Sequence, residues 1–245
     1  MSERMKNIWL PVIVLVAYVL VGGFIIRLTG QAVVATSIMD VAIIVLWAVY
    51  CLRVHDLPKR VVDKKTGLVF VGLFALIFLF GQLAAAWVLE TFGSASYKTY
   101  SNAMSNDVVL SAFLGLIFAP MAEEILLRGV AFGLWRKAMN PYVAMVLQAV
   151  VFAMLHGTLV HAIPTFCFAM FQGVLYARTN RLSVCMATHF LYNGLSAMLG
   201  GLVVPAAFGL PYVFGPILGA SIGALIYIYQ KGLVKDYGKE EEAHA

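Results

Sequence analysis

A series of long, unbroken apolar runs constrains this chain more than any other feature. The first run, IWLPVIVLVAYVLVGGFII, begins at Ile8, and a helix of about 20 such residues crosses the core of a bilayer. The run is too long for the apolar core of a signal peptide and no small-residue cleavage site follows it, so we expect it to remain in the mature protein. The runs predict an all-α membrane protein with several crossings.

The composition supports this interpretation and excludes an ordinary soluble domain. Hydrophobic residues make up 62% of the chain and charged residues only 12%, whereas about a quarter of a soluble domain is charged. The formal net charge of +5 is accounted for by basic residues in the loops, so no nucleic-acid partner is expected. Membrane lipids are the expected surroundings.

Polar or turn-forming residues divide the apolar runs into eight predicted transmembrane helices within one integral membrane domain, residues 1–245. Asn106 and Asp107 suit a helix start, Asn140-Pro141 suits a sharp turn, and Gly157, Asn180 and Gly200-Gly201 suit helix ends. We place the helices near residues 8–28, 33–52, 68–90, 107–138, 142–157, 162–178, 182–200 and 205–230.

The basic residues predict the orientation in the membrane. If all eight runs cross and the N-terminus is cytoplasmic, fourteen Lys and Arg residues fall on the cytoplasmic side. Only Arg27 and Lys98 fall outside, and Arg128 lies within a helix. Because basic residues favour the cytoplasmic side of a membrane, we expect both termini to be cytoplasmic.

Two polar side chains are predicted to meet across the turn at Asn140. Glu123 is seventeen residues before Asn140 and His156 is sixteen after it. In an antiparallel hairpin with a rise of about 1.5 Å per residue, both lie at nearly the same height. The basic end of the first of these helices places that height in the cytoplasmic half of the bilayer.

A third helix brings two more polar side chains to the cytoplasmic half of the bilayer. His189 and Asn193 are one turn apart on one helical face and follow Arg181 by about two and three turns. Four polar groups from three helices are therefore expected to share one pocket that opens to the cytoplasm.

Glu124 and Arg128 have the i, i+4 spacing of an ion pair along a helix. Such pairing makes both charges tolerable in a low dielectric. Because an α-helix has 3.6 residues per turn, Glu123 points about 100° away from Glu124 and is left for another partner. Asp40 is a further acid within an apolar run, and nothing in the sequence connects it with this site.

These residue types suit the hydrolysis of an amide. A carboxylate and an imidazole that face each other can hold and deprotonate a water molecule. A second imidazole and a side-chain amide can donate hydrogen bonds to a developing oxyanion. The sequence therefore predicts a peptidase that uses activated water and forms no covalent acyl-enzyme.

Three short motifs carry a resemblance to a known family. EEILLR, FAMLH and HFLYN are similar to the EExxxR, FxxxH and HxxxN motifs of the CPBP family, in the same order on separate helices. That family contains the type II CAAX prenyl endopeptidases and their bacterial relatives, and the resemblance covers roughly residues 107–200. It implies an intramembrane glutamate protease of about eight helices whose site is reached from the cytoplasm, here of a prokaryotic cell membrane.

The resemblance also implies a role for each motif residue. Glu123 matches the catalytic glutamate and His156 its partner in water activation. His189 and Asn193 match the oxyanion-stabilising pair, while Glu124 and Arg128 match supporting residues. The implied substrate is a hydrophobic or prenylated peptide, although many bacterial relatives are linked to bacteriocin immunity or peptide maturation.

Two other mechanisms remain open at this stage. Glu123, His156 and His189 have the right chemistry for a zinc site, although the HExxH spacing is absent and we expect neither a metal nor another cofactor. Cys185, one turn before His189, is a conceivable thiol nucleophile, although a small core residue is the simpler interpretation.

Two non-enzymatic functions also remain open. A binding protein would use the same pocket to hold a peptide or a lipid and confer immunity without hydrolysis. A proton-coupled transporter would use the buried Glu and His residues as a relay, but the sequence shows no duplicated half.

Overall fold

The computed structural model describes residues 1–51, 63–92 and 113–207, and all regular secondary structure in these ranges is helical. The predicted all-α class is therefore confirmed. The elements are α1 (Glu3–Thr29), α2 (Ala32–Cys51), α3 (Lys64–Phe92), η2 (Leu114–Phe118), α6 (Ala119–Glu124), η3 (Ile125–Phe132), α7 (Gly133–Ala138), α8 (Pro141–Leu155), α9 (Leu159–Thr179) and α10 (Leu182–Ala207).

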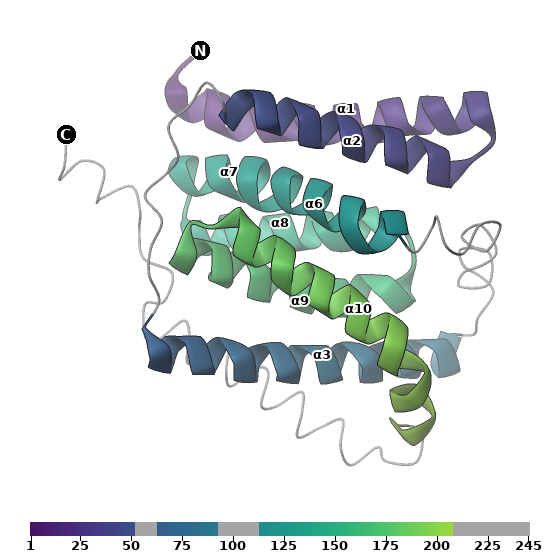
Figure 1. Cartoon of the computed structure of the whole chain (residues 1–245). Helices are drawn as coiled ribbons and strands as arrows, with labels where there is room; N and C mark the ends of the chain where they lie inside the picture. Colours follow the sequence, from purple (N-terminus) through teal and green to yellow (C-terminus); the bar gives the residue numbers. More distant parts are fainter. Residues whose placement is uncertain (52–62, 93–112, 208–245) are drawn as a thin grey trace.

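The helices lie in layers (Figure 1). Helices α1 and α2 pair with each other along one side, and α6 and α7 lie against them. On the opposite side, α3 packs against α9 and α10. Helix α9 also packs against α8, so it lies at the centre of the described bundle.

The core between these layers is formed by aromatic and small side chains. Phe168 stacks on Tyr192 with ring centroids 4.3 Å apart, which joins α9 to α10. Phe171 contacts Phe70 edge-on at 6.1 Å and thereby joins α9 to α3. Small residues such as Ala169 are fully buried in the same cluster, so the helices approach one another closely.

Three of the predicted breaks are confirmed, each with a local cause. Gly157 lies between α8 and α9 in the left-handed conformation at φ 68°. Asn140 caps α8, its side chain accepting a hydrogen bond of 2.9 Å from the backbone N–H of Tyr142, and Pro141 occupies the first turn, where no N–H is needed. Asn180 ends α9 in the left-handed conformation at φ 49°. These caps fix the α7–α8 and α9–α10 turns.

The helix that carries the glutamates is less regular than the sequence predicts. The expected single α-helix contains two π-helical stretches, η2 and η3, on either side of α6. Pro120 follows η2 and has no N–H to donate to the preceding turn, which disfavours a continuous α-helical ladder. Such π-helical turns often occur at functional sites, and here they flank the double glutamate.

The predicted break at Gly200-Gly201 is wrong. Helix α10 continues through both glycines to Ala207. A glycine within a helix costs only about 1 kcal/mol relative to alanine, which the surrounding apolar helix tolerates. Most of the predicted helix 205–230 lies outside the described residues, as do residues 107–112 of the fourth predicted helix and the N-cap residues Asn106 and Asp107.

Four of the described helices are long and apolar enough to cross a membrane: α1, α2, α3 over Lys64–Leu89, and α9. Helix α8 is apolar but shorter, with 15 residues. In α1 and α2 most of the apolar surface is exposed, as expected of helices that face lipid. The chain is an integral membrane protein.

Candidate active site

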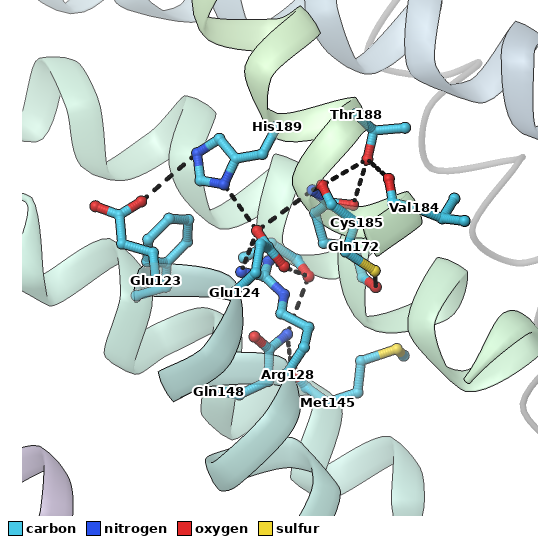
Figure 2. Close-up of polar contacts among 12 residues, drawn as sticks. Glu123, Glu124, Arg128, Met145, Gln148, Gln172, Val184, Cys185, Thr188 and His189 are labelled. Atoms are coloured by element: carbon cyan, nitrogen blue, oxygen red, sulfur yellow. Dashed lines mark hydrogen bonds and ion pairs between the residues drawn. The ribbon is translucent and has the colours of Figure 1, made fainter. Parts of the chain in front are cut away.

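The ion pair predicted between Glu124 and Arg128 is present at the centre of the bundle (Figure 2). The Nη1 atom of Arg128 lies 3.1 Å from Oε1 of Glu124, and both side chains are fully buried. Arg128 also donates to the backbone carbonyl of Ala169 at 3.3 Å and stacks over the ring of Phe152. The pair thus ties the glutamate-bearing helix to α8 and α9.

His189 lies between the two glutamates (Figure 2). Its Nδ1 atom is 2.7 Å from Oε1 of Glu124, and its Nε2 atom is 3.6 Å from Oε2 of Glu123. Each ring nitrogen thus faces a carboxylate oxygen. Glu124 therefore contacts the candidate oxyanion histidine as well as Arg128.

Glu123 is the more accessible of the two glutamates. Its side chain is 26% exposed, whereas that of Glu124 is fully buried. The imidazole that directly faces Glu123 is His189, and no hydrogen bond or ion pair joins Glu123 to His156 within the described residues. That Glu123 and His156 hold a water molecule between them stays a prediction.

His156 lies next to this cluster at the end of α8. Its ring contacts Phe152 edge-on at 4.7 Å, and the ring of Phe152 also contacts His189 at 5.9 Å. The Nδ1 atom of His156 is 2.9 Å from the backbone carbonyl of Phe152. Because a carbonyl only accepts, Nδ1 carries the hydrogen and the neutral ring keeps its lone pair on Nε2.

Asn193 faces the start of the glutamate-bearing helix. Its side-chain amide donates to the backbone carbonyl of Gly115, in η2, over a long 3.4 Å. An amide nitrogen has two hydrogens, so the second hydrogen of Asn193 is available to another acceptor. The side chain is partly buried.

Gln172 belongs to the site and was not singled out from the sequence. It is fully buried in α9, and its Nε2 donates to Oε1 of Glu124 at 3.3 Å and to the carbonyl of Cys185 at 2.8 Å. Its Oε1 accepts from the hydroxyl of Thr188 at 2.9 Å. Its position within a run of apolar residues could have identified it from the sequence, because polar groups within membrane helices are energetically costly and commonly have a function.

The alternative chemistries have little support in the geometry. Within the described ranges, no group of three or more His, Cys, Asp or Glu side chains is arranged to hold a metal ion. Cys185 is fully buried, with its thiol against the carbonyl of Gln172 at 3.9 Å. It is a small, fully buried core residue.

The central part of the chain matches a known family. Residues 105–195 match the family model described as type II CAAX prenyl endopeptidase Rce1-like, which confirms the family predicted from the three motifs. All six candidate residues, Glu123, Glu124, Arg128, His156, His189 and Asn193, lie within the matched range.

A distant relative agrees with this match. The chain is 27% identical over 167 residues to a Bacillus subtilis (strain 168) protein described as "Putative membrane peptidase YdiL", an alignment that covers 60% of this chain and 68% of that protein. No solved structure matches the chain.

Proposed function

We propose that this chain, whose residues 105–195 match the Rce1-like endopeptidase family model, hydrolyses a peptide bond with a water molecule activated by Glu123. The observation that carries the proposal is the position of Glu123: its carboxylate is partly exposed, while its neighbours Glu124, Arg128 and His189 are buried and bonded to one another. A reactive group on a buried polar support is the arrangement expected of a preorganised site.

The water is activated by Glu123 together with His156. The Glu123 carboxylate accepts a proton from water as the water oxygen adds to the peptide carbonyl carbon. The Nε2 lone pair of His156, oriented by the bond from Nδ1 to Phe152, accepts a hydrogen bond from the same water. Glu123 then returns the proton to the leaving amine as the carbon–nitrogen bond breaks.

The oxyanion is stabilised by His189 and Asn193. An N–H of His189 and the second amide hydrogen of Asn193 donate to the carbonyl oxygen as its charge develops. The contact of 2.7 Å with Glu124 holds the imidazole of His189 in position. Glu124 and Arg128 are supporting residues because both are fully buried and out of reach of a substrate.

The substrate is a hydrophobic peptide, with or without a prenyl group on a cysteine. The apolar helices around the site favour such a peptide, and the matched family acts on CAAX prenyl proteins. The excess of Lys and Arg predicted for the cytoplasmic side supports a site that opens to the cytoplasm. The similarity to a Bacillus protein supports a prokaryotic cell membrane, with residues 1–245 acting as one domain.

A paired digestion tests this proposal. Purified wild-type protein and Glu123→Ala, each shown to be folded, are incubated with hydrophobic peptides, some of them farnesylated at a cysteine near the C-terminus. We expect mass spectrometry to find products only with the wild type, and the cleaved bonds to show whether prenylation is required. Equal cleavage by the two proteins would overturn the role of Glu123.

The same variant distinguishes a peptidase from a binding protein. In cells that are protected against a bacteriocin-type peptide by the wild-type chain, a peptidase loses protection with Glu123→Ala. A protein that only masks its target keeps protection with that variant, which would contradict the proposed hydrolysis.

A further inference from the structure

A closed circuit of hydrogen bonds holds α10 against α6 and α9 (Figure 2). The circuit leaves α10 at the side chain of Thr188 and reaches Gln172 of α9. From Gln172 it passes to Glu124 of α6 and returns to α10 at His189. Thr188 directly precedes His189 in the chain, so the circuit begins and ends on adjacent residues. The proposed reaction assigns no role to Thr188.

The hydroxyl of Thr188 is the donor at the start of the circuit. Its Oγ1 lies 2.9 Å from Oε1 of Gln172, and an amide oxygen only accepts. The same hydroxyl lies 3.0 Å and 2.9 Å from the carbonyls of Val184 and Cys185, which already accept from backbone N–H groups of α10. Within the described residues, no donor other than Thr188 reaches Oε1 of Gln172. The single hydroxyl hydrogen is therefore needed by Gln172.

The bond from Thr188 determines which way the Gln172 amide points. With Oε1 turned towards Thr188, Nε2 presents its two hydrogens to the carbonyl of Cys185 at 2.8 Å and to Oε1 of Glu124 at 3.3 Å. Gln172 is fully buried, and a buried amide oxygen without a donor is unfavourable. Without the hydroxyl, the amide has to move to find a donor and loses its place beside Glu124.

Glu124 joins Gln172 to His189. Its Oε1 accepts from Arg128 at 3.1 Å and from Gln172, and a carboxylate that is paired with an arginine has no hydrogen to give. Nδ1 of His189 therefore carries the hydrogen of the 2.7 Å contact with Glu124. The position of this imidazole consequently depends on the rotation at which the circuit holds α10.

The rotation of α10 about its own axis decides where the two candidate oxyanion donors point. His189 and Asn193 are one turn apart on the same face. A side chain ends about 5–6 Å from the helix axis, so a rotation of about 10° moves it by about 1 Å, and a misplacement of about 1 Å can cost about 10²-fold in rate. The circuit fastens α10 at Cys185, Thr188 and His189 and so opposes this rotation.

We propose that Thr188 is a positioning residue, whose hydroxyl orients the Gln172 amide and thereby fixes the rotation of α10 that aims the two oxyanion donors at the substrate carbonyl. The effect on cleavage rests on the proposed function, whereas the effect on the contact between Glu124 and His189 does not. The Thr188 hydroxyl does not contact the substrate in this role.

The ring N–H signal of His189 tests this role without a substrate. In protein with isotope-labelled histidine, the Nδ1 proton is followed by NMR in detergent and assigned as the signal that His189→Gln removes. Thr188→Val keeps the shape of the side chain and removes the donor, so we expect the signal to move upfield as the bond to Glu124 lengthens. Thr188→Ser keeps the hydroxyl and should keep the wild-type signal. An unchanged signal in Thr188→Val would overturn the proposal.

Thr36→Val is the matched control. The Thr36 hydroxyl also reaches two carbonyls of its own helix, at 3.1 Å and 3.0 Å, but bonds to no side chain within the part of the chain that the structure describes, so this variant should keep the wild-type signal. Thr188→Cys has a weaker donor and should shift the signal by less than Thr188→Val. If Thr188→Val does not fold, equal signals in Thr188→Cys and Thr188→Ser would overturn the proposal.

Cleavage kinetics test the role of Thr188 in the reaction. Thr188→Val should lower kcat by about 10–100-fold, because the oxyanion donors are displaced, with KM unchanged, and Thr188→Ser should restore most of the loss. Equal kcat in Thr188→Val and Thr36→Val would overturn this role. If the His189 signal responds as expected but the wild-type protein cleaves no peptide, the proposed function is contradicted and the circuit stands.

Discussion

Glu123 and Glu124 are adjacent in the chain, yet they lie in opposite environments. Oε1 of Glu124 is contacted by Arg128, His189 and Gln172. Glu123 contacts only His189 among these and is partly exposed. One residue therefore holds the cluster together, while the other is free to meet water.

Glu124→Leu should destabilise the protein. It leaves the guanidinium of Arg128 buried without its carboxylate, and breaking a buried ion pair in this way costs about 3–5 kcal/mol. The free energy of unfolding, measured by circular dichroism in detergent, should fall by that amount. Glu123→Gln, the matched control, should unfold like wild type, and equal stability of the two variants would contradict this division of roles.

Gln172→Leu should impair cleavage beyond its effect on stability. The variant loses a donor to Glu124, and one hydrogen bond of about 1.4 kcal/mol corresponds to a tenfold fall in kcat, with little change in KM. Gln148→Leu is the control because Gln148 is equally buried in α8 and donates to the carbonyls of Ala169 and Met145, away from Glu124. A similar loss of kcat in both variants would show that Gln172 affects cleavage only through its packing.

The sequence predicts contacts within one helix better than contacts between helices. The i, i+4 spacing is sufficient to predict the pair of Glu124 and Arg128, because both lie on one helix. The contact of Glu123 with His189 depends on how α10 rotates and packs against α6, and no spacing within one helix contains that information.

At the scale of the element, helix ends are predictable where a turn has its own chemistry. Asn140-Pro141 and Asn180 stop their helices through a cap and a left-handed residue. Gly200-Gly201 has no such requirement, since glycine permits a turn without imposing one. The π-helical stretches η2 and η3 were not predicted, because the apolar pattern is similar for α- and π-helical turns.

Gly81→Ala should destabilise the contact between α3 and α10. A Cβ at this position would clash with the hydroxyl of Tyr192 and lie 3.1 Å from Cβ of Pro164, and overpacking of this kind costs about 1–3 kcal/mol. Within the described residues the Tyr192 hydroxyl has no hydrogen-bond partner, so Tyr192→Phe should restore most of the stability of Gly81→Ala.

Gly72, on the same helix, provides the control for that experiment. A Cβ there would meet nothing within 4 Å, so Gly72→Ala should keep or raise the melting temperature through the better helix propensity of alanine. The account of α3 and α10 would be wrong if Gly81→Ala melted like Gly72→Ala, or if Tyr192→Phe gave no rescue.

At the scale of the whole molecule, α1 and α2 precede the part of the chain that matches the family. They nevertheless lie against α6 and α7. Their place could not be predicted from the sequence, because the surfaces that face lipid and those that face protein are equally apolar. A membrane helix therefore shows little periodicity that would identify its packed side.

Both termini should be cytoplasmic if the distribution of basic residues determines the topology. Epitope tags at either end of the chain, expressed in bacterial spheroplasts, should resist a protease added from outside. They should be removed once the membrane is permeabilised. Cleavage of either tag in intact spheroplasts would show that this end of the chain lies outside the cell membrane, which would contradict the predicted orientation.

The central claim is that water activated by Glu123 cleaves the peptide. The most direct test is kcat/KM of folded Glu123→Gln and Cys185→Ser on one peptide that the wild type cleaves. Glu123→Gln should lose activity by about 10²–10⁴-fold, the usual contribution of a general base, while Cys185→Ser should keep it. Retained activity in Glu123→Gln, or loss confined to Cys185→Ser, would contradict the account.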